Sequence, residues 1–128
     1  MHPIKVTCAI ITFQNKILAV QRSKRMSMPL KWEFPGGKIE QAETETDCIK
    51  REIREELNIE IDVLERLTPT VYSYPTFTIE LIPYRANYVG GELQLKEHYQ
   101  YLLLNKQELD SLDWADADWA IMREIMKL

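Results

Sequence analysis

Cysteine and histidine are scarce in this sequence, with two of each among 128 residues. Cys8 and Cys48 form no CxxC pair and are too few for a disulfide scaffold, so we expect two buried thiols. His2 and His98 are too few for a histidine-rich zinc site. A disulfide-stapled fold and a histidine zinc centre are therefore excluded.

Long apolar runs are also lacking. None approaches the roughly 20 residues that cross a bilayer, and the first five residues do not contain the apolar stretch of a secretory signal. We therefore expect a cytoplasmic protein with no membrane partner.

Positive charge is in deficit, with 16 Lys and Arg against 20 Asp and Glu and a net charge of −4. Proteins that bind nucleic acids usually present a basic face, so we expect no nucleic acid polymer as a partner. An acidic protein can still bind a polyanion through bound metal ions, because these dominate the local field.

The length suits one domain, residues 1–128. Residues rich in β-formers predict strands at 6–13, 17–20, 59–64, 70–74, 77–88 and 99–104. The first two should form a hairpin about a turn at 14–16. We expect Pro83 at a bulge or a sheet edge and a turn at Gly90-Gly91. Helices are predicted over 44–57, 105–112 and 117–128. The fold class is a mixed α/β domain with strands on both sides of one central helix.

The central helix has clear end signals and a buried stripe. Thr44 is a good N-cap, and Asn58 tolerates the left-handed conformation of a helix C-terminus. Ile49, Ile53 and Leu57 recur every four residues and should face the core.

Three carboxylates gather late on this helix, at Glu52, Glu55 and Glu56. Like charges at these spacings cost roughly 0.2–0.5 kcal/mol per pair, and the helix C-terminus disfavours negative charge. One interpretation is a solvated face that Arg51 and Arg54 neutralise. The other is a platform for Mg²⁺, which takes oxygen ligands from carboxylates, phosphates and water.

The surrounding pattern favours the second interpretation. Residues 37–59 run Gly, five residues, Glu43, seven residues, then Arg-Glu-Ile-Arg-Glu-Glu-Leu-Asn-Ile. This resembles the Nudix box in every fixed position except Asn58, where the family usually has Gly. Asn is the next-best residue for positive φ, so the turn should survive.

The resemblance implies a Nudix fold, in which helices sandwich a mixed β-sheet, and a hydrolase that acts on diphosphate linkages. It implies Mg²⁺ as cofactor, with Mn²⁺ as a substitute. Glu43 and Arg51 look structural, the alternative for Glu43 being a solvated loop acid. The implied catalytic residues are Glu52, Glu55, Glu56 and Glu97. The implied metal site uses these same four carboxylates and the carbonyl of Gly36.

The run from Trp32 to Glu40 is similar to the MutT-like branch, which sanitises the nucleotide pool. The similarity covers nearly the whole chain and weakens after Ile59. It implies base and phosphate contacts for six residues, namely Arg22, Glu33, Phe34, Lys38, Tyr74 and Asp118. The aromatic segment around Tyr74 could equally be an ordinary cross-strand pair. His98 is expected to be a loop residue, not a ligand.

Asp118 stands where MutT proper has an Asn, and resembles the CTP pyrophosphohydrolase branch. Ionised Asp only accepts hydrogen bonds, so it could read a cytosine amino group or a guanine edge. The alternative is a simple cap for the last helix.

The resulting expectation is a nucleoside triphosphate pyrophosphohydrolase that releases a nucleoside monophosphate and pyrophosphate, 8-oxo-dGTP being the first candidate substrate. CTP or a modified dCTP is the second candidate. A nucleotide-binding regulator without turnover is the alternative from another class. We expect a monomer or a homodimer.

Overall fold

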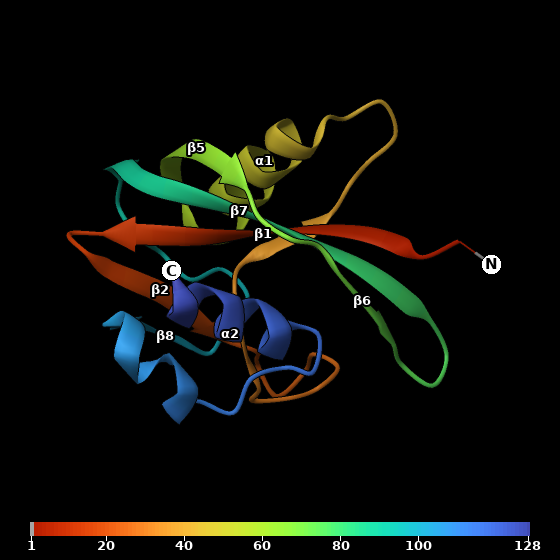
Figure 1. Ribbon diagram of the computed structural model, residues 1–128. Coiled ribbons are helices and arrows are strands. Elements are labelled where there is room, and N and C mark those ends of the chain that lie inside the picture. The colour runs from red at the N-terminus through yellow and green to blue at the C-terminus, as the bar shows by residue number, and fades with distance from the viewer. Residues whose placement is uncertain (1) are drawn as a thin grey trace.

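A mixed β-sheet runs through the middle of the molecule in the computed structural model, which describes residues 2–128 (Figure 1). Within these residues eight strands form one sheet, with a path of β3-β2-β1-β7-β5. Only β1 and β7 pair in parallel; the remaining pairs are antiparallel. The strands are β1 (Ile4–Phe13), β2 (Lys16–Gln21), β3 (Trp32–Glu33), β4 (Gly36–Lys38), β5 (Ile59–Arg66), β6 (Thr70–Ser73), β7 (Thr78–Gly91) and β8 (Gln100–Leu104).

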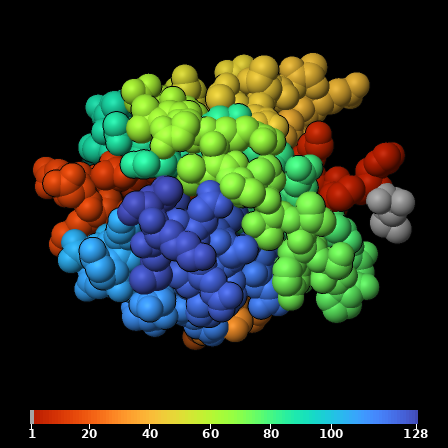
Figure 2. All heavy atoms as spheres, viewed as in Figure 1, coloured from red at the N-terminus to blue at the C-terminus, as the bar shows by residue number. Residues whose placement is uncertain are grey.

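Helices cover both faces of this sheet, as expected from the resemblance. Helix α1 (Glu45–Leu57) lies on one face, and α2 (Asp118–Lys127) with the 3-10 helix η1 (Lys106–Ser111) lies on the other. In the space-filling view α2 and η1, in blue, form a continuous layer beside the protruding β6–β7 hairpin (Figure 2). No described helix is long and apolar enough to cross a membrane.

Strand β1 supplies side chains to both cores, because successive residues of a strand point to opposite faces. Ala9 and Ile11 pack with the buried stripe of α1, whereas Cys8 and Ile10 pack with α2 and η1. Both cysteines are buried and free, as expected. A strand buried on both faces has no polar alternation, which explains its continuous apolar sequence.

The ends of α1 form as predicted. The Thr44 hydroxyl accepts a hydrogen bond of 3.1 Å from the backbone N–H of Asp47. Asn58 adopts φ 60° and ψ 31°, and its N–H donates to the Arg54 carbonyl. Its side chain also donates to the Glu92 carbonyl at 3.1 Å. Asn therefore supplies the left-handed turn of the usual Gly and ties α1 to the segment after β7.

One expectation for the second half of the chain is wrong, and another is confirmed in one of its two forms. Gly90 and Gly91 form no turn; they extend β7 and pair with Glu60 and Ile59 of β5. Pro83 is not on a sheet edge, because β7 pairs with β1 on one side and with β5 and β6 on the other. The predicted irregularity is real, since the register of β5 against β7 shifts between Val63 and Arg66, next to this proline.

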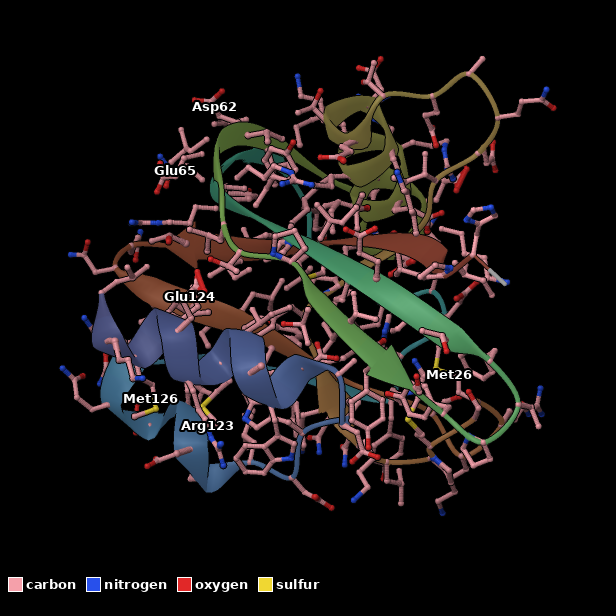
Figure 3. All side chains as sticks on the ribbon, turned by 45° about the vertical axis from the view of Figure 1, so that its right-hand side comes forward. Met26, Asp62, Glu65, Arg123, Glu124 and Met126 are labelled. Atoms are coloured by element: carbon pink, nitrogen blue, oxygen red, sulfur yellow. The ribbon has the colours of Figure 1, made fainter. Side chains whose placement is uncertain are left out.

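Helix α2 is tied to its surroundings by its polar side chains (Figure 3). Glu124 lies on the side of the helix toward the sheet, and its carboxylate accepts a 3.3 Å hydrogen bond from the N–H of Thr68. Within the helix, Arg123 lies 5.6 Å from the ring centre of Trp119, a cation–π distance. The Glu124 contact ties the helix, whose first residue is Asp118, to the segment before β6.

Candidate active site

Strand β4 and helix α1 bring the acidic residues of the box together. Of the helix carboxylates, the Glu52 side chain is 17% exposed and the Glu55 side chain 60% exposed. Glu56 is partly buried. The charged run is therefore not a uniformly solvated face.

Arg51 connects these acids into a network. Its Nε and Nη2 donate to the two Glu43 carboxylate oxygens at 2.6 and 3.0 Å. Its Nη1 donates to Glu52 at 2.8 Å and to Glu55 at 3.0 Å. The guanidinium lowers the pKa of Glu43 to about 2, with help from the Glu40 backbone. These contacts support the structural role expected for Glu43 and Arg51, and not a solvated loop acid.

Replacing Arg51 by Lys tests this network. An ammonium has no planar fork and cannot bind Glu43 through two nitrogens while also reaching Glu52. We expect turnover to fall by roughly 10–100-fold, the usual cost of disturbing groups that orient metal ligands. Steady-state kinetics of Arg51→Lys measures this. Arg54→Lys is the control, because the Arg54 side chain donates to Glu60, an exposed partner outside the site.

The two glycines before the helix allow close backbone approach. A Cβ on Gly36 would overlap the Thr7 carbonyl oxygen of β1, and one on Gly37 would overlap the Glu52 carboxylate. Without these side chains, the loop can pack against β1 below and against Glu52 above. The pair Gly36-Gly37 thus sets where the Glu52 carboxylate lies.

Glu56 is the most perturbed acid of the group. Burial first, and then the adjacent Glu52, raises its pKa to about 10, with smaller contributions from Glu33 and Glu97. Its Oε1 is buried and has no hydrogen-bond partner among residues 2–128. A buried carboxylate oxygen without a partner costs free energy, so this position favours a proton or a cation.

Glu97 comes from a loop that is fixed to the end of α1. The N–H groups of Gln94 and Lys96 donate to the carbonyls of Leu57 and Glu56 at 3.0 and 3.1 Å. The charge of Glu97 makes the smallest of the contributions that raise the pKa of Glu56. The structure therefore holds the loop that carries this distant acid against the C-terminal end of α1.

These residues fit a hard divalent cation by their chemistry. The donors are carboxylate oxygens, which Mg²⁺ and Mn²⁺ prefer, and the unpartnered oxygen of Glu56 favours a cation in place of a proton. Among the described residues no three acidic, histidine or cysteine side chains already converge as a closed ligand set. The Arg51 bonds to Glu52 and Glu55 explain this, because they hold both carboxylates toward the guanidinium.

A cavity of about 120 Å³ lies between β1, the 22–31 loop and the start of α2. It opens beside a larger hollow of about 410 Å³ that Lys38 and Phe77 line. Five of the six predicted substrate residues line the inner cavity, namely Arg22, Glu33, Phe34, Tyr74 and Asp118. Lys38, the sixth, lines the outer hollow, where a phosphate could reach it.

Asp118 is 5% exposed at the floor of this cavity. Its Oδ2 accepts a 2.9 Å hydrogen bond from the Phe34 N–H. It does not cap α2: the N-cap is Ala117, without a side-chain cap bond, so that alternative is wrong. Burial, followed by the Glu33 carboxylate, raises the pKa of Asp118. A carboxylate in this setting favours a ligand that donates a proton or a hydrogen bond.

Tyr74 belongs to the cavity and not only to a cross-strand pair. Its hydroxyl accepts a 3.2 Å hydrogen bond from the Ala117 N–H, next to Asp118. Its ring stacks on Phe77 at 5.1 Å and contacts Tyr72 at 4.7 Å. Tyr74 lines the inner cavity and Phe77 the outer hollow, so these two stacked rings form an aromatic wall beside the acidic floor.

His98 is the residue that sequence reasoning missed. Its side chain is 2% exposed, and its Nε2 lies 2.8 Å from Glu33 Oε2. The other Glu33 oxygen accepts a 2.7 Å bond from Arg22 Nη1. The signal was its position directly after Glu97, but nothing local indicated burial or the distant partner.

The comparisons with known proteins agree with this geometry. The family model described as NUDIX domain matches residues 1–127. The chain belongs to the NUDIX family.

Similar members of this NUDIX family cover most of the chain. The CTP pyrophosphohydrolase of Escherichia coli (strain K12) is 33% identical over 128 residues, covering 100% of this chain and 95% of that protein. A putative 8-oxo-dGTP diphosphatase 2 of Mycobacterium tuberculosis (strain ATCC 25618 / H37Rv) is 32% identical over 105 residues, covering 80% of this chain and 73% of that protein.

A solved structure has the same fold. It is the MutT protein, a Nudix hydrolase, from methicillin-resistant Staphylococcus aureus 252, with a TM-score of 0.79 and 42% identity. It covers 98% of this chain and 97% of that one. The sequence-based prediction of a Nudix hydrolase is thus confirmed.

Proposed function

We propose that this Nudix hydrolase is a Mg²⁺-dependent nucleoside triphosphate pyrophosphohydrolase. It would release a nucleoside monophosphate and pyrophosphate, and would serve to sanitise the nucleotide pool in the cytoplasm. The observation that carries the proposal is that a cavity with an acidic floor lies next to the carboxylates of α1. Gly36 lines this cavity, and a Cβ on the adjacent Gly37 would overlap the Glu52 carboxylate.

In this proposal the side chains divide the work along the substrate. Asp118 and Glu33 would hydrogen-bond the edge of the base, and Arg22 and the aromatic wall would contact its faces. Lys38 would bind a phosphate. Glu52, Glu55, Glu56 and Glu97, with the Gly36 carbonyl, would hold the cation, which neutralises phosphate charge and acidifies bound water. Glu52 is also the candidate general base, whose proton transfer typically contributes 10²–10⁴-fold.

The purine 8-oxo-dGTP is the first candidate substrate, because the aromatic wall and the acidic floor suit a large base with N–H donors. CTP or a modified dCTP is the second, since its amino group can also donate to Asp118. The similarity to a protein named CTP pyrophosphohydrolase favours this second reading. A regulator without turnover is the least favoured, because binding alone does not need a buried unpartnered carboxylate at Glu56.

A substrate panel tests the proposal. Pyrophosphate release from 8-oxo-dGTP, dGTP, CTP, dCTP and 5-methyl-dCTP is measured with Mg²⁺, with EDTA as the control. We expect release from at least one triphosphate and none in EDTA. Release from no nucleotide would leave the regulator as the better reading.

The base preference depends on Asp118. We expect Asp118→Asn to change the ranking of the panel by about tenfold, because an amide adds a donor where a carboxylate oxygen stood. The turnover of the best substrate should change less. The matched control is Asp116→Asn, whose carboxylate does not line the cavity and accepts a hydrogen bond from the Tyr72 hydroxyl. An unchanged ranking would remove Asp118 from base recognition.

A further inference from the structure

His98 is a buried polar side chain that the proposed reaction does not use. It is 8% exposed as a residue, and its Nδ1 has no hydrogen-bond partner among residues 2–128. Its one side-chain bond joins Nε2 to Glu33 Oε2 at 2.8 Å. Because Glu33 also accepts from Arg22, its carboxylate is the acceptor here and Nε2 donates. Burying a partly satisfied imidazole costs free energy, so this bond needs an explanation.

The bond belongs to a series of hydrogen bonds that ends in the base cavity. His98 donates to Glu33, and the other Glu33 oxygen accepts a 2.7 Å bond from Arg22 Nη1. The Arg22 Nε donates to the Ser27 carbonyl at 2.6 Å and Nη2 to the Ser27 hydroxyl at 3.1 Å. Arg22, Glu33 and Met28 of this region all line the cavity. His98 thus fixes the acidic side of the cavity and, through it, the loop around Ser27.

His98 also anchors the loop that carries Glu97. Glu97 immediately precedes His98, the Lys96 N–H donates to the Glu56 carbonyl, and the Tyr99 N–H donates to the Gln21 carbonyl. Backbone bonds therefore hold the residues on either side, and the His98 imidazole is the side-chain anchor between them. Glu33, its partner, lies close enough to Glu56 to raise that pKa and close enough to Asp118 to do the same.

We propose that His98 is a positioning residue that couples base recognition to cation binding. By holding Glu33 it orients the acidic edge of the base cavity, and by anchoring its own loop it places Glu97 against the carboxylates of α1. A nucleobase that moves Glu33 therefore also moves Glu97. This inference rests on the proposed function, and its test includes a readout that needs no turnover.

The experiment compares two replacements of His98. His98→Gln keeps a side-chain N–H that can donate to Glu33, whereas His98→Leu fills a similar volume without a donor. Calorimetry gives the Kd of Mn²⁺ without nucleotide and the Kd of dGMP and CMP, and kinetics on the panel gives kcat and KM. Circular dichroism and Tm report the fold, and His2→Leu, at an exposed histidine, is the matched control.

We expect His98→Leu to raise the Kd of Mn²⁺ by roughly tenfold or more, the range for groups that support metal ligands. It should also reduce the difference between dGMP and CMP affinities and change KM as well as kcat. His98→Gln should stay within about threefold of the parent on each measure. The double variant His98→Leu/Glu33→Gln should be no worse than the worse single variant, because both remove one interaction.

The proposal is overturned if folded His98→Leu keeps the parent Kd of Mn²⁺ and the parent nucleotide preference. It is also overturned if His98→Gln loses as much as His98→Leu with the same fall in Tm, since that indicates packing alone. Should His98→Leu not fold, His98→Asn replaces it with the same expectations. The amide of Asn is one carbon closer to the backbone than that of Gln, so it should be too short to donate to Glu33. Failure of the proposed function gives a different result, namely no hydrolysis by the parent enzyme, whatever the Mn²⁺ affinities of the variants.

Discussion

Glu52→Gln is expected to lower kcat by about 10²–10⁴-fold, the usual contribution of a positioned general base, without unfolding the protein. The amide has nearly the shape of the carboxylate and can still accept the 2.8 Å bond from Arg51. It fits the space that Gly37 leaves open. What it loses is the negative charge and the ability to take a proton from water. Pyrophosphate release on the best substrate of the panel measures the effect, and circular dichroism reports the fold.

Glu60→Gln is the matched control for this variant. Glu60 carries the same carboxylate on β5, where it binds the exposed Arg54 at 2.7 Å, away from the cavity. Its turnover should stay within about twofold of the parent, since exposed ion pairs contribute little. Near-parent turnover of Glu52→Gln would remove Glu52 from the mechanism and shift the role of base to Glu97.

The parts of the fold that sequence could predict are those with local causes. The N-cap Thr44, the four-residue spacing of Ile49, Ile53 and Leu57, and the left-handed Asn58 all act within a few residues of one another. The hairpin turn also has a local cause. Gln14 and Asn15 both adopt positive φ, as a two-residue hairpin turn requires. The spacing of Glu52, Glu55 and Glu56 along one helix decides their relative positions, and the resemblance to the Nudix box supplied their expected role.

The remaining features depend on contacts between distant segments. The predicted turn at Gly90 and Gly91 is wrong, because the pairing of these residues with β5, about 30 positions earlier, leaves no local signal in the sequence. The bond between His98 and Glu33 spans 65 positions. Asp118 resembled a cap in sequence because it stands at a helix start, yet its carboxylate is used by Phe34, 84 positions earlier. Such partners follow from topology and not from the order of neighbouring residues.

Replacing Glu56 by Gln is the second change with a large expected effect. It should stabilise the metal-free protein in alkaline buffer and lower turnover. In the unfolded chain the pKa of Glu56 is near the ordinary 4.5, whereas in the folded protein it is about 10. Between these values the folded state holds a proton that the unfolded state has lost. Stability is therefore fully present below pH 4.5 and falls as the pH rises through the folded pKa. The metal-free enzyme should be least stable in alkaline buffer.

Gln at this position cannot ionise, so Glu56→Gln should remove this contribution to the pH dependence of stability. In EDTA at pH 9 we expect the variant to be more stable than the parent by on the order of 2 kcal/mol, because the folded parent must keep the Glu56 carboxyl group protonated at a pH far above its pKa in the unfolded chain. This corresponds to a Tm rise of roughly 5–10 °C. At pH 5 the two proteins should differ little. Glu55→Gln, at a side chain that is 60% exposed, should change stability little at either pH.

Adding cation should reverse the order of the two proteins. Mg²⁺ or Mn²⁺ binds only the folded state, and so raises the Tm of the parent at pH 9 according to its affinity. It should raise the Tm of Glu56→Gln much less, because the charge that favours the cation is gone, and turnover should fall at least as far as in Glu52→Gln. Thermal melts at both pH values, with EDTA and with Mn²⁺, check this. If Glu56→Gln destabilises the metal-free protein at pH 9, or if Mn²⁺ stabilises both proteins equally, the Glu56 carboxylate is not the buried charge that the cation neutralises.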